Sequence, residues 1–343
     1  MKTLQQICYW IIALQLFGIA DMARSEPVKL SVESYTIPAK DPGIELYVRN
    51  KRPADMQTFT PEKTLLYVHG ATYPSETAFD LELGGYSWMD YIASRGYDVY
   101  LLDLRGYGRS TRPAVMDQPA KDNEAIVRTE TAVSDIQAVV EHIMKRRGVQ
   151  KLNLLGWSWG TTTMGSYAAQ HPAQVNKLVL YAPVWLRKEP LKLPPGPIPA
   201  YRTVTKEAAK QRWLAGVPAD KQKDLIPDGW FEAWGNATFE TDAWGMQQNP
   251  PLLRAPNGVV YDIQNYWAAG KPLYDPANIT APTLIVHAEW DQDTPAYMSQ
   301  ALFPLLTHAA SKRYIVIGEG THTVIMEKNR LQLFRETQLF LDE

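Results

Sequence analysis

Residues 152–170 read LNLLGWSWGTTTMGSYAAQ, and this stretch decides the fold. Its first residues form a short apolar run, which is typical of a buried strand, and its last residues fit a helix that packs closely on a sheet. Between them, Gly156, Ser158 and Gly160 form a G-x-S-x-G pattern. In the order strand, turn, helix, this pattern exposes a serine hydroxyl at a sharp turn, where flanking glycines keep the crowded backbone free of side chains. We therefore predict that Ser158 is a nucleophile.

Eight apolar runs of strand length, including this one, alternate with helical patterns along the chain. They cover residues 28–37, 44–50, 63–70, 98–110, 152–160, 176–183, 282–291 and 313–322. Among the helical patterns, residues 124–147 place apolar side chains on one face, and Gly148 follows as a C-cap. Because continuous apolar runs are typical of buried parallel strands, we predict an α/β fold with a mainly parallel eight-stranded sheet flanked by helices.

One region breaks this alternation. Residues 184–275 contain the proline-rich stretch KEPLKLPPGPIP and many tryptophans, without a clear strand pattern. We predict that this region is a helical cap inserted into a core formed by residues 26–183 and 276–343. Tryptophans in a cap that roofs a pocket favour an apolar cavity lined by aromatic side chains.

The first 25 residues have the features of a secretory signal peptide. Lys2 supplies a positive start, residues 7–20 are largely apolar, and small residues suited to a signal peptidase follow. The apolar stretch is short for a membrane span, which needs about 20 residues. We therefore predict cleavage, a periplasmic or secreted location, and no stable membrane anchor after cleavage. Cys8, the only cysteine, would leave with the signal, and a chain without thiols suits an oxidising compartment.

Composition and charge argue against several classes of protein. Apolar residues make up 45% and charged residues 21% of the 343 residues, which is ordinary for a globular chain and argues against disorder. The formal net charge of −2, without a long basic run, argues against a nucleic-acid partner. The single cysteine, the lack of an H-E-x-x-H motif and the scattered histidines predict neither a metal site nor a cofactor.

From about residue 40 onward, the chain resembles serine hydrolases of the α/β-hydrolase fold that carry an inserted cap, esterases in particular. The resemblance places the catalytic acid after a late strand, where HAEWDQDTP (287–295) is similar to the family's G-x-x-D-x-x-x-P. Asp291 fits that spacing, although Ala288 stands where the family usually has glycine. Asp293, two residues later, is the alternative acid.

The same resemblance makes His322 the expected base. This histidine stands in the loop GEGTH (318–322), after the last predicted strand. Ser158, Asp291 and His322 follow one another in the order that this fold uses, unlike other classes of serine hydrolase. In such an arrangement the acid fixes the tautomer of the imidazole, and the imidazole takes the serine proton.

Acyl transfer also requires donors for an oxyanion, and the resemblance assigns these to two backbone N–H groups. One is that of Trp159, the residue after the nucleophile. The other is that of Ala71, in the loop HGATYP (69–74), with Thr72 as the alternative. For contacts with the substrate we predict Trp157, Thr72 and Trp185.

Together these motifs predict an exported serine hydrolase that cleaves a carboxylic ester, or a lactone, of a medium-sized hydrophobic small molecule through an acyl-enzyme. Two alternatives stay open. Residues 156–183 also resemble proline iminopeptidases, which hold a substrate amine with acidic cap residues, here Glu232, Glu240 and Asp242. The first alternative is therefore an iminopeptidase or another amide hydrolase. The second is a non-catalytic binding module on a hydrolase fold. We make no prediction of the oligomeric state.

Overall fold

Eight strands form the central sheet of the structure, a computed structural model that describes residues 28–189 and 196–343. In chain order they are β1 (Leu30–Pro38), β2 (Glu45–Pro53), β3 (Thr64–Val68), β4 (Asp98–Leu102), β5 (Leu152–Trp157), β6 (Val175–Tyr181), β9 (Thr283–Ala288) and β10 (Lys312–Ile317). Their order across the sheet is β1-β2-β4-β3-β5-β6-β9-β10. Strand β2 runs antiparallel to both of its neighbours, and all other neighbouring pairs are parallel. The predicted mainly parallel eight-stranded sheet is confirmed.

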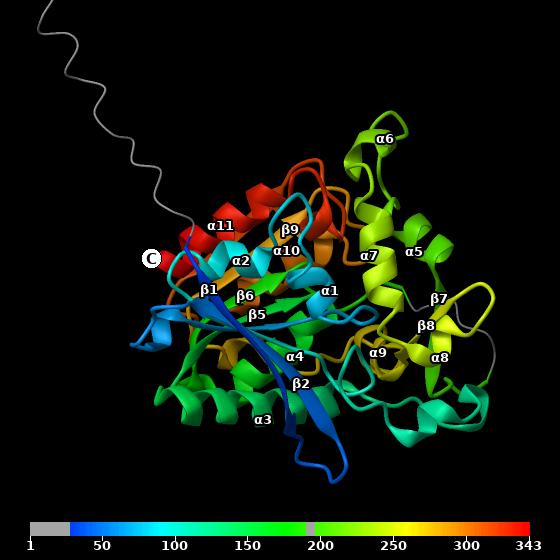
Figure 1. Cartoon of the computed structure of the whole chain (residues 1–343), viewed down its shortest axis with the longest axis horizontal. Coiled ribbons are helices and arrows are strands. Elements are labelled where there is room, and N and C mark those ends of the chain that lie inside the picture. Colours follow the sequence, from blue (N-terminus) through cyan, green and yellow to red (C-terminus); the bar gives the residue numbers. More distant parts are fainter. Residues whose placement is uncertain (1–27, 190–195) are drawn as a thin grey trace, which may run out of the picture.

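Helices cover both faces of this sheet (Figure 1). On one face, α3 (Thr129–Arg147), α4 (Trp159–Gln170) and α10 (Ala296–Leu305) contribute to one hydrophobic cluster. On the other face, α1 (Glu76–Phe79), α2 (Trp88–Ala93) and α11 (Arg330–Asp342) contribute to a second cluster. Strands β3, β4, β5 and β9 are buried along their whole length between the two clusters, which explains their continuous apolar sequences.

The chain between β6 and β9 forms a cap beyond one end of the sheet, on the right of Figure 1. Its helices are α5 (Lys206–Trp213), α6 (Gln222–Leu225), α7 (Trp230–Phe239), α8 (Ala243–Met246) and α9 (Gly258–Asp262), followed by a π-helical turn (Ile263–Trp267). The cap, predicted to be mostly helical, also contains a feature that the sequence did not indicate, because β7 (Tyr201–Thr205) and β8 (Leu252–Pro256) pair as an antiparallel two-stranded sheet. Four helices separate these short strands in the chain, so no local turn signal marks the pairing.

The cap lies over the edge of the sheet at which the parallel strands end. The loops that follow β3, β5, β9 and β10 meet there, and open α/β sheets bind their ligands at this edge. Both the predicted signal peptide, residues 1–25, and part of the proline-rich stretch, residues 190–195, lie outside the described residues. Within the described ranges, no helix has the length and apolar character needed to cross a bilayer.

Candidate active site

Ser158 occupies the turn between β5 and α4. Its backbone angles are φ +58° and ψ −123°, a conformation that costs a non-glycine residue of the order of 1–3 kcal/mol. The flanking glycines are required by space. A Cβ atom on Gly156 would lie 2.2 Å from the carbonyl oxygen of Gly160, and one on Gly160 would lie 2.5 Å from the carbonyl oxygen of Val68. The turn therefore projects the Ser158 side chain from the end of β5.

His322 is fixed by contacts on both its ring and its backbone. Its Nδ1 donates a hydrogen bond of 2.8 Å to Oδ2 of the buried Asp291. Thr294 completes the coordination of that carboxylate with its backbone N–H and its hydroxyl, each at 2.8 Å. The carbonyl oxygen of His322 accepts hydrogen bonds from Trp157 Nε1 at 3.0 Å and from the Tyr181 hydroxyl at 2.8 Å. The base loop is thus tied to strands β5 and β6.

The charges and hydrogen bonds around this pair move the pKa values of Asp291 and His322 further apart. Burial favours neutral Asp291, but the charge of His322 and the hydrogen bonds from His322 and Thr294 outweigh it, so the pKa of Asp291 is lowered. Burial also favours neutral His322, but Asp291 and Asp293 attract its proton, so the pKa of His322 is raised. Asp291 therefore stays ionised and stabilises an imidazolium at residue 322.

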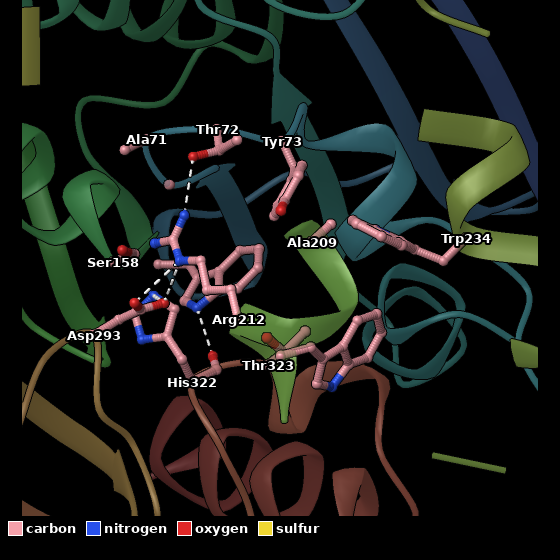
Figure 2. A pocket seen from close by; sticks show the side chains of 13 residues that line it. Ala71, Thr72, Tyr73, Ser158, Ala209, Arg212, Trp234, Asp293, His322 and Thr323 are labelled. Atoms are coloured by element: carbon pink, nitrogen blue, oxygen red, sulfur yellow. Dashed lines mark hydrogen bonds and ion pairs between the residues drawn. The ribbon is translucent and has the colours of Figure 1, made fainter. Parts of the chain in front are cut away.

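The second nitrogen of His322 faces a cavity that Ser158 also lines (Figure 2). Asp293, the alternative acid, lies on this side, with Oδ2 at 4.0 Å from Nε2. Its carboxylate is held by Arg212 Nε of α5, at 3.0 and 2.8 Å to its two oxygens. The structure therefore brings Asp291, and not Asp293, against Nδ1. Among the described residues, Ser158 Oγ has no hydrogen-bond partner, and catalytic contacts of this kind often tighten only when substrate binds.

The loop after β3 lies directly against Ser158, since a Cβ atom on Gly70 would be 2.9 Å from the serine Cβ. His69 holds this loop from behind. Its Nε2 accepts from Leu104 N–H at 3.1 Å, so Nδ1 is the donor to the Gly70 carbonyl at 2.6 Å. Burial lowers the pKa of His69 to about 4, so this imidazole is neutral.

Three backbone N–H groups beside Ser158 are available to an anion. Those of Ala71 and Thr72 donate to no described residue. That of Trp159 belongs to the first residue of α4, where helix N–H groups lack an intrahelical acceptor. The indole of Trp159 points elsewhere, since it is buried and its Nε1 donates to Thr129 Oγ1 at 3.0 Å. The predicted oxyanion donors thus lie at the expected loop and helix terminus.

The space bounded by these groups, here called the Ser158 cavity, has a volume of about 400 Å³ including its opening to solvent. Core and cap both contribute to its walls, which consist of Gly70, Ala71, Thr72, Tyr73, Trp157, Ser158, Ala209, Arg212, Trp213, Trp234, Asp293, His322 and Thr323. Trp157 and Thr72 line it, as predicted for substrate contacts. Trp185 does not, because it is buried in the core with its ring edge-on to Tyr274 at 5.4 Å.

Other predicted polar residues also lie away from this cavity. Asp242 is fully buried and paired with Arg254 at 2.7 Å, while Glu240 lines a separate hollow between core and cap, and Glu232 lines another within the cap. Within the part of the chain that the structure describes, no group of three or more histidine, cysteine or carboxylate side chains is arranged to hold a metal ion.

Sequence analysis missed the charged residues that the cap adds. Arg212 enters the Ser158 cavity, and Arg202 of β7 contacts the loop after β3. Both arginines lie in the segment YRTVTKEAAKQR (201–212), which contains no motif that points to a functional role. Contacts between residues about 130 positions apart carry no local pattern.

Comparisons with known proteins show the family and the fold. The alpha/beta hydrolase fold family matches residues 63–329. Protein ABHD8 from Homo sapiens is 25% identical over 244 residues, which cover 70% of this chain and 48% of that protein. The chain thus spans about half the length of the first curated relatives it matches. A proline iminopeptidase from Xylella fastidiosa (strain 9a5c) is 32% identical over 280 residues, covering 71% of this chain and 81% of that protein.

Solved structures resemble the chain in fold. A serine hydrolase involved in carbazole degradation aligns with a TM-score of 0.59 at 17% identity, covering 91% of this chain and 99% of that one. An esterase from Exiguobacterium antarcticum aligns with a TM-score of 0.57 at 18% identity, covering 91% and 100%. At these identities the likeness is one of fold. Since the family match extends over most of the sequence and the sheet topology agrees with it, the chain belongs to the α/β-hydrolase fold family.

Proposed function

We propose that this chain is an exported serine hydrolase that cleaves a carboxylic ester, or a lactone, of a small molecule by way of an acyl-enzyme on Ser158. One observation carries the proposal. His322 donates from Nδ1 to the buried Asp291, which leaves its Nε2 facing the cavity that Ser158 lines. A base oriented in this way by a carboxylate is what a serine hydroxyl needs in order to become nucleophilic.

In the first half of the proposed reaction, Ser158 Oγ bonds to the substrate carbonyl carbon while His322 Nε2 takes the hydroxyl proton. The carbonyl oxygen becomes negative and accepts hydrogen bonds from the N–H groups of Trp159 and Ala71. His322 then gives its proton to the departing alcohol oxygen, and the acyl group stays on the serine. Asp291 keeps the imidazolium stable between these two proton transfers, in agreement with its lowered pKa.

In the second half, a water molecule replaces the alcohol. His322, again neutral, takes a proton from this water, and the hydroxide attacks the acyl carbon. Collapse of the second tetrahedral intermediate releases the carboxylic acid and returns the proton to Ser158. Because the reaction requires neutral His322, the rate should fall as the pH drops through its pKa, which is raised above the ordinary value.

The walls of the Ser158 cavity support a substrate that is largely apolar. Trp157, Trp213, Trp234 and Tyr73 present aromatic surface to it, and such rings bind hydrophobic groups without a charge requirement. Arg212 and Asp293 add one polar corner, in which the two charges neutralise each other.

The proline iminopeptidase relative, 32% identical over 280 residues, favours a second candidate, hydrolysis of amides after an N-terminal proline. A substrate amine would need a free carboxylate near Ser158. Glu232, Glu240 and Asp242 do not line the Ser158 cavity, and Asp293, which does, is already paired with Arg212. The charge balance in the cavity therefore favours the ester.

A substrate panel separates the candidates. Purified protein is assayed with p-nitrophenyl esters of increasing acyl length, with aliphatic lactones, and with proline p-nitroanilide, beside the Ser158→Ala variant as a blank. We expect hydrolysis of the esters to exceed that of the anilide. Preference for proline p-nitroanilide would instead establish the iminopeptidase, and the absence of serine-dependent turnover on every substrate would favour the binding module.

Export is the remaining part of the proposal, and it rests on the sequence of residues 1–25. Expression of the full chain in a Gram-negative host, followed by fractionation and N-terminal sequencing, tests it. We expect a periplasmic protein whose first residue lies near position 26. A full-length product in the cytoplasm would contradict it.

A further inference from the structure

Arg202 of β7 reaches from the cap to the loop beside Ser158. Its Nη2 donates to the carbonyl oxygen of Ala71 at 2.6 Å and to Thr72 Oγ1 at 2.8 Å. Its Nη1 donates to the Pro256 carbonyl at 2.6 Å and to Asn257 Oδ1 at 3.2 Å. All four acceptors are neutral, so one guanidinium clamps the loop after β3 to the end of β8.

No counter-ion accompanies this cation. Within residues 28–189 and 196–343, no carboxylate oxygen lies within 4.0 Å of the Arg202 guanidinium. Several arginines with little exposed side chain are paired with carboxylates, namely Arg105 with Asp135, Arg147 with Asp98 and Arg254 with Asp242, whereas Arg330 shares the lack of such a partner among the described residues. Burial lowers the pKa of Arg202, yet an arginine remains charged at neutral pH. Arg202 is half-buried and has no carboxylate partner among the described residues, an arrangement that is unfavourable for folding, so its place beside Ser158 requires an explanation other than stability.

The hydrogen bonds of Arg202 fix the direction of one peptide group. The carbonyl of Ala71 points toward Arg202 and toward the hydroxyl of Tyr107, which donates to it at 2.9 Å. In a trans peptide the C=O and the next N–H point in opposite directions, so the N–H of Thr72 points away from both donors. The preceding carbonyl, that of Gly70, is likewise turned toward the ring of His69. Both carbonyls of this loop therefore accept hydrogen bonds, and the N–H groups that follow them, those of Ala71 and Thr72, donate to none of the residues that the structure describes.

We propose that Arg202 is a positioning residue for the oxyanion hole. It holds the Ala71–Thr72 peptide so that its carbonyl cannot turn toward the reacting oxygen. It also places a positive charge behind the loop, and this charge stabilises the negative charge that develops on the substrate oxygen in front of the loop. Because Arg202 belongs to β7, the cap completes the oxyanion hole of the core in addition to covering it. This inference rests on the proposed acyl-transfer function.

The test compares Arg202→Met, which removes charge and donors at similar volume, with Arg202→Lys, which keeps the charge but loses the paired donors. Arg330→Met is the matched control. Arg330 likewise donates to a backbone carbonyl, that of Leu83, but it is buried elsewhere and lies outside the Ser158 cavity. Each protein is assayed for kcat and KM with one p-nitrophenyl ester and for binding of a boronic acid, which forms a tetrahedral anion on serine.

We expect kcat of Arg202→Met to fall with little change in KM, and by less than the roughly 10²–10³-fold that loss of an oxyanion donor costs, since Arg202 orients the loop and donates nothing to the oxyanion itself. Boronate affinity should fall in parallel, Arg202→Lys should lie between this variant and wild type, and Arg330→Met should keep the wild-type kcat. If Arg202→Met does not fold, Arg202→Ala assayed with millimolar guanidinium replaces it, and recovery of kcat on adding guanidinium is expected.

Three results would overturn the inference. An unchanged kcat in Arg202→Met, with an active wild type, would remove Arg202 from the oxyanion hole while leaving the proposed function intact. A rise in KM at constant kcat would make it a substrate-binding residue instead. A wild type that neither turns over any ester nor binds the boronate would overturn the proposed function itself, and this inference with it.

Discussion

The two walls of the Ser158 cavity are built differently. On the core side, Ser158, Asp291 and His322 lie in the loops that follow strands β5, β9 and β10, and Thr294 holds Asp291 from three residues away. On the cap side, Arg202 and Arg212 extend across the gap between cap and core to loops that are distant in sequence. The core therefore supplies the groups proposed to react, whereas the cap supplies charges that orient the loops of the site and shift the pKa of His322. Substitutions in the core should therefore have the larger effects.

Ser158→Ala should have the largest effect of all. Removal of the hydroxyl leaves nothing to carry the acyl group, so we expect kcat for ester hydrolysis to fall about 10⁴-fold or more. Ser166→Ala is a matched control on the same helix, because Ser166 is buried, its hydroxyl has no partner among residues 28–189 and 196–343, and it does not line the cavity. A Ser158→Ala protein that retains more than a small fraction of the rate would place the nucleophile elsewhere.

The two aspartates of the loop after β9, Asp291 on the core side of His322 and Asp293 on the cap side, should differ in their effect on kcat. Asp291→Asn removes the charge that orients and stabilises His322, and we expect kcat to fall about 10²–10⁴-fold. Asp293→Asn removes only the partner of Arg212, so its effect on kcat should be below about tenfold. Steady-state kinetics on both variants provide the measurement. The reverse ranking would show that Asp293 is the acid.

Substitutions in the polar corner of the cavity should move the pH profile. The Asp293 carboxylate raises the pKa of His322, and the Arg212 guanidinium lowers it. The acid limb of kcat/KM should therefore shift to lower pH in Asp293→Asn and to higher pH in Arg212→Met. Shifts of the same sign in both variants would show that the limb does not report on His322.

The last expected effect is on stability, with no change in rate expected, and concerns Glu327, which contacts both walls of the cavity. Its buried carboxylate accepts hydrogen bonds from Trp213 Nε1 of the cap at 2.8 Å and from the Thr321 N–H at 3.0 Å, and also one from the Thr321 hydroxyl. Burial raises its pKa from 4.5 to about 7, although these hydrogen bonds lower it.

Between these two pKa values the folded chain holds a proton that the unfolded chain has lost. The free energy of unfolding should therefore decrease as the pH rises from 4.5 to 7, by up to about 3 kcal/mol from this group. Glu327→Gln should lack this contribution. Urea denaturation of both proteins at pH 5 and pH 7.5 provides the measurement, and equal pH dependence in the two would contradict the raised pKa.

The core could be predicted from sequence because its signals are local. The turn at Ser158 is encoded by five consecutive residues, and the spacing of Asp291 after its strand is enough to rank it above Asp293. Gly148 ends α3 with φ +68°, as its place after the helical pattern predicts. The start of α3 is different. The pattern begins at residue 124, but the helix begins at Thr129, whose N–H and hydroxyl donate to Asp262 at 2.8 and 2.7 Å.

The details of the cap could not be predicted from sequence, because its contacts join segments that are distant in the chain. Strands β7 and β8 form only by pairing with each other across four helices, and the roles of Arg202 and Arg212 depend on which loop of the core they reach. Tryptophan content indicated an aromatic wall, which Trp213 and Trp234 provide, but it could not tell these residues from Trp185, which packs in the core.

The central claim is that His322 and Asp291 make the hydroxyl of Ser158 reactive, and covalent labelling with a fluorophosphonate tests it most directly. Folded protein is labelled, digested and mapped by mass spectrometry, beside His322→Ala. The account predicts one modification per chain, carried by Ser158, and its loss in the histidine variant. Folded wild-type protein that stays unlabelled, or a label on any other residue, would contradict it.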